Sequence, residues 1–350
     1  MWQLAAALFK QAAGKDTALK IASYIGLVVG LAVMAGLIAW QGVADIWGLL
    51  AETGWVLLLV PLIWVPSALM NARCWQTLFQ PGFGPTFGQA FMAQWMGRAV
   101  NTLLPVASIG GEVVKARVLI LWGIEADHAS ASAVVDKTIQ ALTIIAWGAF
   151  GAVLLSVLAL DDELVTSVLA GGALIGAGIA GFIVVQQAGM FGFMANTAHK
   201  LTKSEYFGNL VDAASGIDQR TRELYRLKGR VFGATMWRLV ALVSQTGEVW
   251  LAAYLLGYPI SIVEALLLKS LSSTLSDFAF VVPNSYGVQE GAFVVLGGLV
   301  GLAPEVALAI SLAIRIRELL IDVPGLVLWQ HTEGKALFKR RRAVKETPAD

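Results

Sequence analysis

The sequence predicts an all-α, polytopic integral membrane protein in one domain, residues 1–350, with six spanning helices and two broken re-entrant hairpins. Hydrophobic residues make up 57% of the chain and charged residues only 14%, against roughly 25% charged in soluble domains. The mean hydropathy is +0.71. Two further observations complete the prediction: several uncharged runs are long enough to span, and two apolar stretches share one pattern of interruption.

Six apolar runs predict the spanning helices. The run at 21–40 holds about twenty residues, which is enough to cross a bilayer. The predicted spans are residues 21–40, 54–70, 133–160, 164–187, 231–256 and 304–329.

The two interrupted stretches cover about residues 87–122 and 262–301. In the first, Pro105 is followed by Gly110, Gly111 and then Glu112; in the second, Pro283 is followed by Gly287 and then Glu290. Proline ends a helix and glycine permits the reversal that follows. Broken backbone at membrane depth is tolerated only inside protein or beside a wet cavity. Each stretch is therefore predicted to be a hairpin of two half-helices, with the break non-helical over 105–112 and 283–290; two thin complete spans are the alternative.

Charge distribution sets the orientation. Three lysines precede the first span, and the polar loop 199–230 and the tail 331–350 are rich in Lys and Arg. Residues 161–163 are all acidic. Because basic loops stay in the cytoplasm, both termini, the loop and the tail are predicted to be cytoplasmic.

This orientation makes the unit of span, hairpin and span occur twice, at about 54–160 and 231–329. The first hairpin enters from the cytoplasmic face and the second from the opposite face. Such inverted repeats place a binding site near the bilayer midplane, between the repeats.

Acidic groups at membrane depth are candidate functional residues. Glu112 has Lys115 three residues later, on the same helix face. Glu290 has no basic neighbour at this spacing, so Arg315 or Arg317 of the last span is its expected partner. The restarting helices present amino-terminal N–H groups that suit an anion. The candidate substrate-binding residues are Arg98, Asn101, Glu112, Lys115, Lys269, Asp277, Glu290 and Arg315.

Structural roles compete with these assignments. The buried pairs could simply lock helices together, and Arg98 and Asn101 could form hydrogen bonds inside the first hairpin. Asp136 and Lys137 begin a predicted span and could mark its interface. Glu248 is expected to be interfacial rather than catalytic.

No cofactor, metal site or catalytic residue is expected. Cys74 is the only cysteine and the three histidines are scattered, which predicts neither a disulfide nor a metal cluster. The nucleotide-binding Gly-x-x-x-x-Gly-Lys-Ser/Thr pattern does not occur. The energy source is therefore expected to be an ion gradient, mass action or a partner.

Several short motifs carry a family resemblance. They are Asn101-Thr102-Leu103-Leu104-Pro105, Gly110-Gly111-Glu112-Val113-Val114-Lys115, Val135-Asp136-Lys137, Pro283-Asn284-Ser285-Tyr286-Gly287-Val288-Gln289-Glu290-Gly291 and Arg315. From about residue 20 to 330, the chain resembles the flippase-like family related to the transmembrane half of lysylphosphatidylglycerol synthase. The sequences at 283–291 and 315–318 are similar to those of the hopanoid-biosynthesis-associated branch of this family. That family often shows Glu-Arg and a downstream Asp where this chain has Asp136, Lys137 and Gln140.

The resemblance implies movement of an amphiphilic lipid, such as a hopanoid or a phospholipid, between leaflets of the bacterial inner membrane. Membrane lipids are the implied partners, with lipid-synthesis enzymes as further candidates and no nucleic acid. Arg98, Lys115, Lys269 and Arg315 are expected to face a groove that takes an anionic or heavily hydroxylated headgroup. Lipid aminoacylation is not expected to carry over, because the longest polar stretch is only 199–230. An integral-membrane lipid transferase, or a scaffold using that basic loop, is the alternative. The glycine-rich run 171–181 could pack closely on another helix, in this chain or in a second copy.

Overall fold

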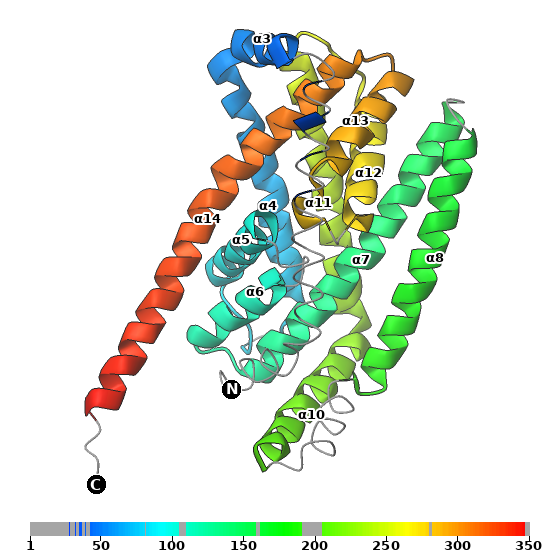
Figure 1. Cartoon of the computed structure of the whole chain (residues 1–350). Coiled ribbons are helices and arrows are strands. Elements are labelled where there is room, and N and C mark those ends of the chain that lie inside the picture. The colour runs from blue at the N-terminus through cyan, green and yellow to red at the C-terminus, as the bar shows by residue number, and fades with distance from the viewer. Residues whose placement is uncertain are drawn as a thin grey trace.

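The computed structural model describes residues 43–80, 82–104, 110–158, 162–190, 205–279 and 282–346, with a few single positions between 28 and 39. All regular structure in these residues is helical (Figure 1), as predicted. Most of the predicted span at 21–40 lies outside the described residues.

One order of elements occurs twice: a long helix, two short helices and a second long helix. The first set is α4 (Leu59–Leu78), α5 (Phe87–Leu103), α6 (Gly110–Leu121) and α7 (Ala126–Val157). The second set is α11 (Lys228–Leu255), α12 (Ile262–Phe278), α13 (Val288–Leu299) and α14 (Pro304–Glu346). The remaining elements are α3 (Val43–Thr53), the 3-10 helices η1 (Gly54–Leu58) and η2 (Pro283–Ser285), α8 (Asp162–Gln187) and α10 (Glu205–Arg226).

The short helices have matching lengths in the two sets. α5 and α12 have 17 residues each, and α6 and α13 have 12 each. At 1.5 Å per residue these arms are about 25 and 18 Å long, shorter than a hydrocarbon core of about 30 Å. Arms of this length favour half-span hairpins over the alternative of thin complete spans.

Matching caps start both hairpins. Thr86 and Gln89 form a reciprocal capping box at the start of α5, and Ser261 and Glu264 form one at α12. Each box satisfies backbone donors that the first turn leaves free. The hairpins lie at different heights: α12 and α13 are near the top of Figure 1, and α5 and α6 are lower, close to its middle.

Two hydrophobic clusters divide the core. One gathers buried side chains mainly from α4 to α7, and the other gathers them mainly from α11 to α14. α11 packs along α4, α14 along α5 and α12 along α7, so each set is bound to the other. The elements that carry the two breaks are therefore held between the two clusters.

Close packing of α7 on α12 depends on two glycines. A Cβ at Gly148 would lie 2.6 Å from Cγ2 of Thr274, and one at Gly151 would overlap the Ser270 hydroxyl. The predicted stripe at 171–181 differs, because Gly178 and Gly181 have open space beside them in the described structure.

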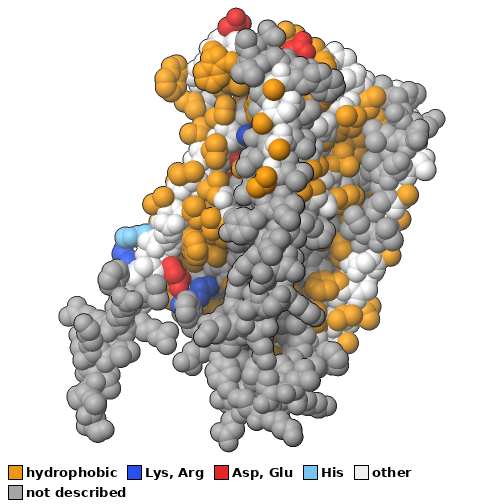
Figure 2. Space-filling view, viewed as in Figure 1, with side chains coloured by type: hydrophobic (Ala, Val, Ile, Leu, Met, Phe, Trp, Pro, Cys, Tyr) orange, Lys and Arg blue, Asp and Glu red, His pale blue; other side chains and the backbone are white. Residues whose placement is uncertain are grey.

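Two helices are long and apolar enough to cross a membrane by length and composition, at Leu50–Leu78 and Ala126–Val157. The predicted count of six stays a prediction. α11 and α14 each carry several charged residues within their length, which explains why they do not meet that criterion. The described side chains on the face in Figure 2 are mostly hydrophobic, and charged ones show only as small groups. Large apolar side chains such as Trp55, Val157 and Phe232 are highly exposed, which suits contact with lipid.

Candidate functional site

The first break lies between α5 and α6. The Asn101 side chain accepts a hydrogen bond of 2.7 Å from the Gly111 N–H, so it caps the restarting helix from within the hairpin. Gly111 sits against the Gly97 carbonyl, and a Cβ there would overlap that oxygen. Pro105 and the rest of 105–109 lie outside the described residues.

The second break runs from the end of α12, through η2, to α13. Asn284, Ser285 and Gly287 have φ values of 49°, 50° and 79°, a left-handed conformation that is costly for residues with a side chain. The Ser285 hydroxyl donates to the Ser276 carbonyl, and the Gly287 N–H donates to the Glu290 carboxylate over 2.7 Å. These bonds tie the turn to both flanking helices.

The non-helical segments are shorter than predicted. α6 already begins at Gly110 and α13 at Val288, so Glu112 and Glu290 lie in first helical turns instead of in the breaks. The N–H groups expected to suit an external anion also have internal partners. The Asn101 side chain accepts a hydrogen bond from the Gly111 N–H of α6, and the Glu290 carboxylate accepts one from the Gly287 N–H just before α13.

A first charge cluster joins α6, α7 and α11. Asp136 is its centre: it is 1% exposed, accepts from Lys115 over 2.6 Å and from Arg238 over 2.5 Å. Lys115 also lies 2.5 Å from Glu112, the pair predicted from spacing. Lys137 lies 4.0 Å from the other oxygen of Glu112. The members are Glu112, Lys115, Asp136, Lys137 and Arg238.

A second charge cluster centres on α14. Arg315 donates to Glu290 over 2.7 Å and to Glu318 over 2.9 Å, and also to the carbonyl of Asn284 in the break. The predicted partner of Glu290 is thus confirmed as Arg315. The members are Arg98, Glu248, Lys269, Glu290, Arg315, Arg317, Glu318 and Asp322.

Glu248 extends this second cluster into α11 and α12. It is fully buried, receives a 2.6 Å hydrogen bond from Lys269 and lies 3.1 Å from Arg317. The prediction that Glu248 is interfacial was therefore wrong. A buried carboxylate with two cations is stabilised where an isolated one would be very costly.

Arg98 connects the first hairpin to the second charge cluster. It donates to Asp322 of α14 over 3.1 Å, and its guanidinium lies 4.5 Å from the ring centre of Trp64. Arg317 approaches the same ring at 5.4 Å. Arg98 thus bonds across to α14, whereas Asn101 bonds inside its own hairpin.

Comparison with known proteins agrees with the resemblance. The family described as "Lysylphosphatidylglycerol synthase TM region" matches residues 27–324. This range contains both hairpins and all members of the two charge clusters. The chain belongs to this family. No curated protein and no solved structure gave a match.

Family membership makes this a membrane protein related to lipid chemistry, and the structure adds where its predicted site residues lie. Lys115, Lys269 and Arg315 are buried and each contacts a carboxylate. Of the basic groups predicted to face a headgroup, Arg98 alone keeps a substantial exposed surface, at 31% of its side chain. Their role in substrate binding stays a prediction.

Sequence reasoning missed the centre of the first cluster. Asp136 was considered as an interface marker, whereas it joins three helices. Arg238 lies inside a predicted span, and an arginine at that depth needs a counter-ion; this signal could have pointed to a buried acid. Its second partner, Asn71 of α4, accepts over 2.7 Å and has no comparable signal in the sequence.

Asp277 differs from the other candidates. It lies in the last turn of α12 and is exposed. No hydrogen bond or ion pair joins it to another residue in the described part of the chain. The cations whose charges act on it most strongly are Lys137, Lys269 and Arg238.

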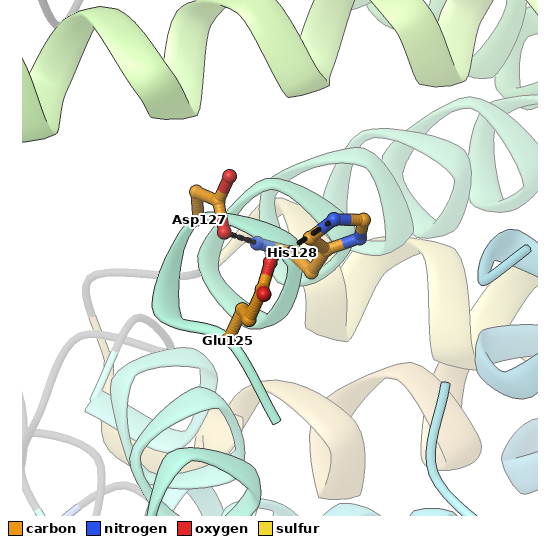
Figure 3. Close-up of side chains that lie close together, drawn as sticks. All are labelled: Glu125, Asp127 and His128. Carbon is orange, nitrogen blue, oxygen red and sulfur yellow. Dashed lines mark hydrogen bonds and ion pairs between the residues drawn. The ribbon is translucent and has the colours of Figure 1, made fainter. Parts of the chain in front are cut away.

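At the start of α7 the structure brings one histidine close to two acids (Figure 3), although the sequence predicted no metal cluster. The possible ligand atoms of Glu125, Asp127 and His128 lie within 4.8 Å of one another. Asp127 accepts from the His128 N–H over 2.8 Å and from Arg220 over 3.1 Å, so both its oxygens have partners. We interpret this group as an ion-pair contact between α7 and α10.

Proposed function

We propose that this protein moves an amphiphilic lipid between the leaflets of the bacterial inner membrane, with both termini in the cytoplasm. The observation that carries the proposal is the joining of the two hairpins by buried charge. Arg98 of the first hairpin meets Asp322 and Glu318 on α14, while Asn284 of the second break donates to the same Glu318 over 3.0 Å. Polar groups thus meet inside a molecule whose outside is largely apolar.

Such an arrangement suits a lipid. The headgroup needs a polar route, whereas the acyl or terpenoid tail stays in the hydrocarbon and needs only an apolar exterior. A water-soluble substrate would instead need a closed polar pathway. The family's name refers to a lipid-linked enzyme region, which supports a lipid over a soluble substrate; a phospholipid or a hopanoid is the class that we propose.

Interchangeable ion pairs supply the physical basis for movement. Glu318 contacts Arg315 at 2.9 Å, Arg317 at 3.8 Å and Arg98 at 3.9 Å. Exchange among these partners keeps each charge paired while α5 and α14 shift. This matters because leaving one charge alone in the interior costs about 3–5 kcal/mol.

We also propose that the chain acts without covalent chemistry on the lipid. The buried acids identified above are held by basic groups, which leaves them poorly placed to accept a substrate proton. A lipid transferase is the outcome to be excluded by experiment, as is a scaffold that only gathers lipid-synthesis enzymes.

Purified protein in liposomes tests the proposal. The liposomes would contain a lipid with a fluorescent tail, and a membrane-impermeant reductant would quench the outer leaflet. Protein-free liposomes should lose about half of the signal, because only the outer half is reachable; active protein should make nearly all of it reachable. Unchanged protection of the inner leaflet would contradict lipid movement. Mass spectrometry of the same lipids would reveal a transferase by a new product.

A further inference from the structure

Asp277 stands out because it is an acid exposed deep inside a hairpin. α12 begins at Ile262, so its axis carries Asp277 about 22 Å from the hairpin's entrance at 1.5 Å per residue. An ionised carboxylate at such depth is costly unless water or a cation solvates it. Its exposed surface therefore faces either a wet space or a ligand.

The register of α7 against α12 relates Asp277 to the polar residues of α7. Gly151 lies against Ser270, and Gly148 lies against Thr274. Residue numbers fall on α7 as they rise on α12, so one further turn brings Ile144 and Ile145 to the level of Asp277, and Gln140 lies one turn beyond them. Lys137 follows within the next turn, and its ammonium donates to Gln140 over 3.3 Å.

Lys137 is the least satisfied cation of the first charge cluster. Its side chain is 36% exposed, and its nearest carboxylate, Glu112, lies 4.0 Å away. That same Glu112 is already 2.5 Å from Lys115. By contrast Lys115 and Arg238 are buried against Asp136.

A count of the charges in each cluster also singles out Lys137 and Asp277. The first cluster holds three bases and two acids, so it carries one excess positive charge. The second holds four bases and four acids and is balanced. Asp277 would neutralise the first cluster, yet it belongs to neither set of contacts. An exposed anion and a partly exposed cation thus remain apart, about two turns or 11 Å from each other along two packed helices.

We propose that Lys137 and Asp277 bind the two charged groups of a zwitterionic lipid headgroup, with the phosphate at Lys137 and the ammonium at Asp277. This deepens the proposed lipid movement and rests on it. One zwitterion completes both ion pairs. A singly anionic headgroup would satisfy Lys137 but leave Asp277 beside a negative ligand, and a cationic one would do the reverse.

Direct lipid binding tests this inference separately from lipid movement. Detergent-purified protein would be titrated with phosphatidylethanolamine, phosphatidylglycerol and a cationic O-ethylphosphatidylcholine of identical acyl chains, with binding followed by native mass spectrometry. Wild type should prefer phosphatidylethanolamine about tenfold over each of the other two, a factor that one ion pair can supply.

Each variant should lose one preference. Asp277→Asn should bind phosphatidylethanolamine and phosphatidylglycerol about equally, and Lys137→Gln should lose discrimination against the cationic lipid. Asp277→Glu and Lys137→Arg keep the charges and should keep the wild-type order, which gives a second comparison if a neutral variant fails to fold. Glu52→Gln and Lys228→Gln, both at exposed positions, should behave as wild type.

Wild-type protein without headgroup preference, or an Asp277→Asn variant with the full preference, would overturn the inference. These outcomes are distinct from failure of the proposed function. Selective binding without movement in liposomes would remove the flippase and keep the headgroup site. Equal binding and movement of all three lipids would remove the headgroup site and keep the flippase.

Discussion

The two hairpins have helices of the same lengths and the same kind of cap, but they hold two acids in different environments. Glu112, in the first, keeps 16% of its side chain exposed and pairs within its own helix. Glu290, in the second, is fully buried, accepts from its own preceding turn and pairs with α14. The comparison teaches that equivalent places in two similar units can serve different purposes. The second acid fixes its break, whereas the first retains a surface on which charge can be exchanged.

The largest effect should come from Arg315→Met. Removing this cation leaves Glu290 and Glu318 without their main partner, at a cost of about 3–5 kcal/mol. Thermal unfolding in detergent should show a large loss of stability or no folded protein. Arg226→Met, at an exposed position, is the control. A mild loss at Arg315 would show that the second break does not depend on its ion pairs.

Neutralising the two acids tests the comparison directly. Glu290→Gln should cost about 3 kcal/mol, since it leaves Arg315 with a single carboxylate in the interior. Glu112→Gln should cost about 1 kcal/mol, because Lys115 retains Asp136. The second variant should nevertheless slow lipid movement more per folded molecule. Equal stability losses, measured by thermal unfolding of matched samples, would mean that the two acids are equivalent after all.

Glycine substitution tests the packing of the first hairpin. Gly111→Ala forces a Cβ onto the Gly97 carbonyl, and we expect a loss of about 1–3 kcal/mol from overpacking. Gly291→Ala in the second hairpin meets open space and should be close to neutral. The melting temperatures of the two variants measure this difference. A Gly111→Ala variant as stable as wild type would show that α5 and α6 have room to separate.

The smallest effects should come from the caps. Thr86→Ala and Ser261→Ala each remove the side-chain acceptor of a capping box and should cost about 1 kcal/mol. The two losses should agree with each other within measurement error, because the hairpins match at their entrances and differ only at their breaks. If the two stability losses differ clearly in unfolding experiments, the hairpins already differ at their starts and not only at their breaks.

Local features of this fold could be predicted from the sequence, and long-range contacts could not. Proline and glycine marked both breaks, and spacing within one helix found the pair of Glu112 and Lys115. Arg315 or Arg317 was the expected partner of Glu290 because a buried acid needs a base and few were available, and the structure selects Arg315. The partners of Asp136 and Glu248 come from separate helices. Sequence shows that a charge lies at membrane depth, but which helix faces it depends on packing that only the structure defines.

Position within a predicted span was also an incomplete guide to role. Glu248 lies near one end of its span and was assigned to the interface, yet α12 and α14 cover it completely. The lengths of the breaks were overestimated because the glycines at 110 and 111 were assigned to the turn. In the structure they begin a helix, and the missing side chain of Gly111 allows α6 to touch α5.

Gly148 and Gly151 determine how closely α7 and α12 can pack. They let α7 pack closely on α12 about one helical turn from Asp277 and about two turns from Gln140. The missing methyl groups therefore help to determine how far Lys137 lies from Asp277, and with it the span of a headgroup that can bridge them. If these two residues recognise a zwitterion, the size limit on that ligand is determined by two positions that never touch it.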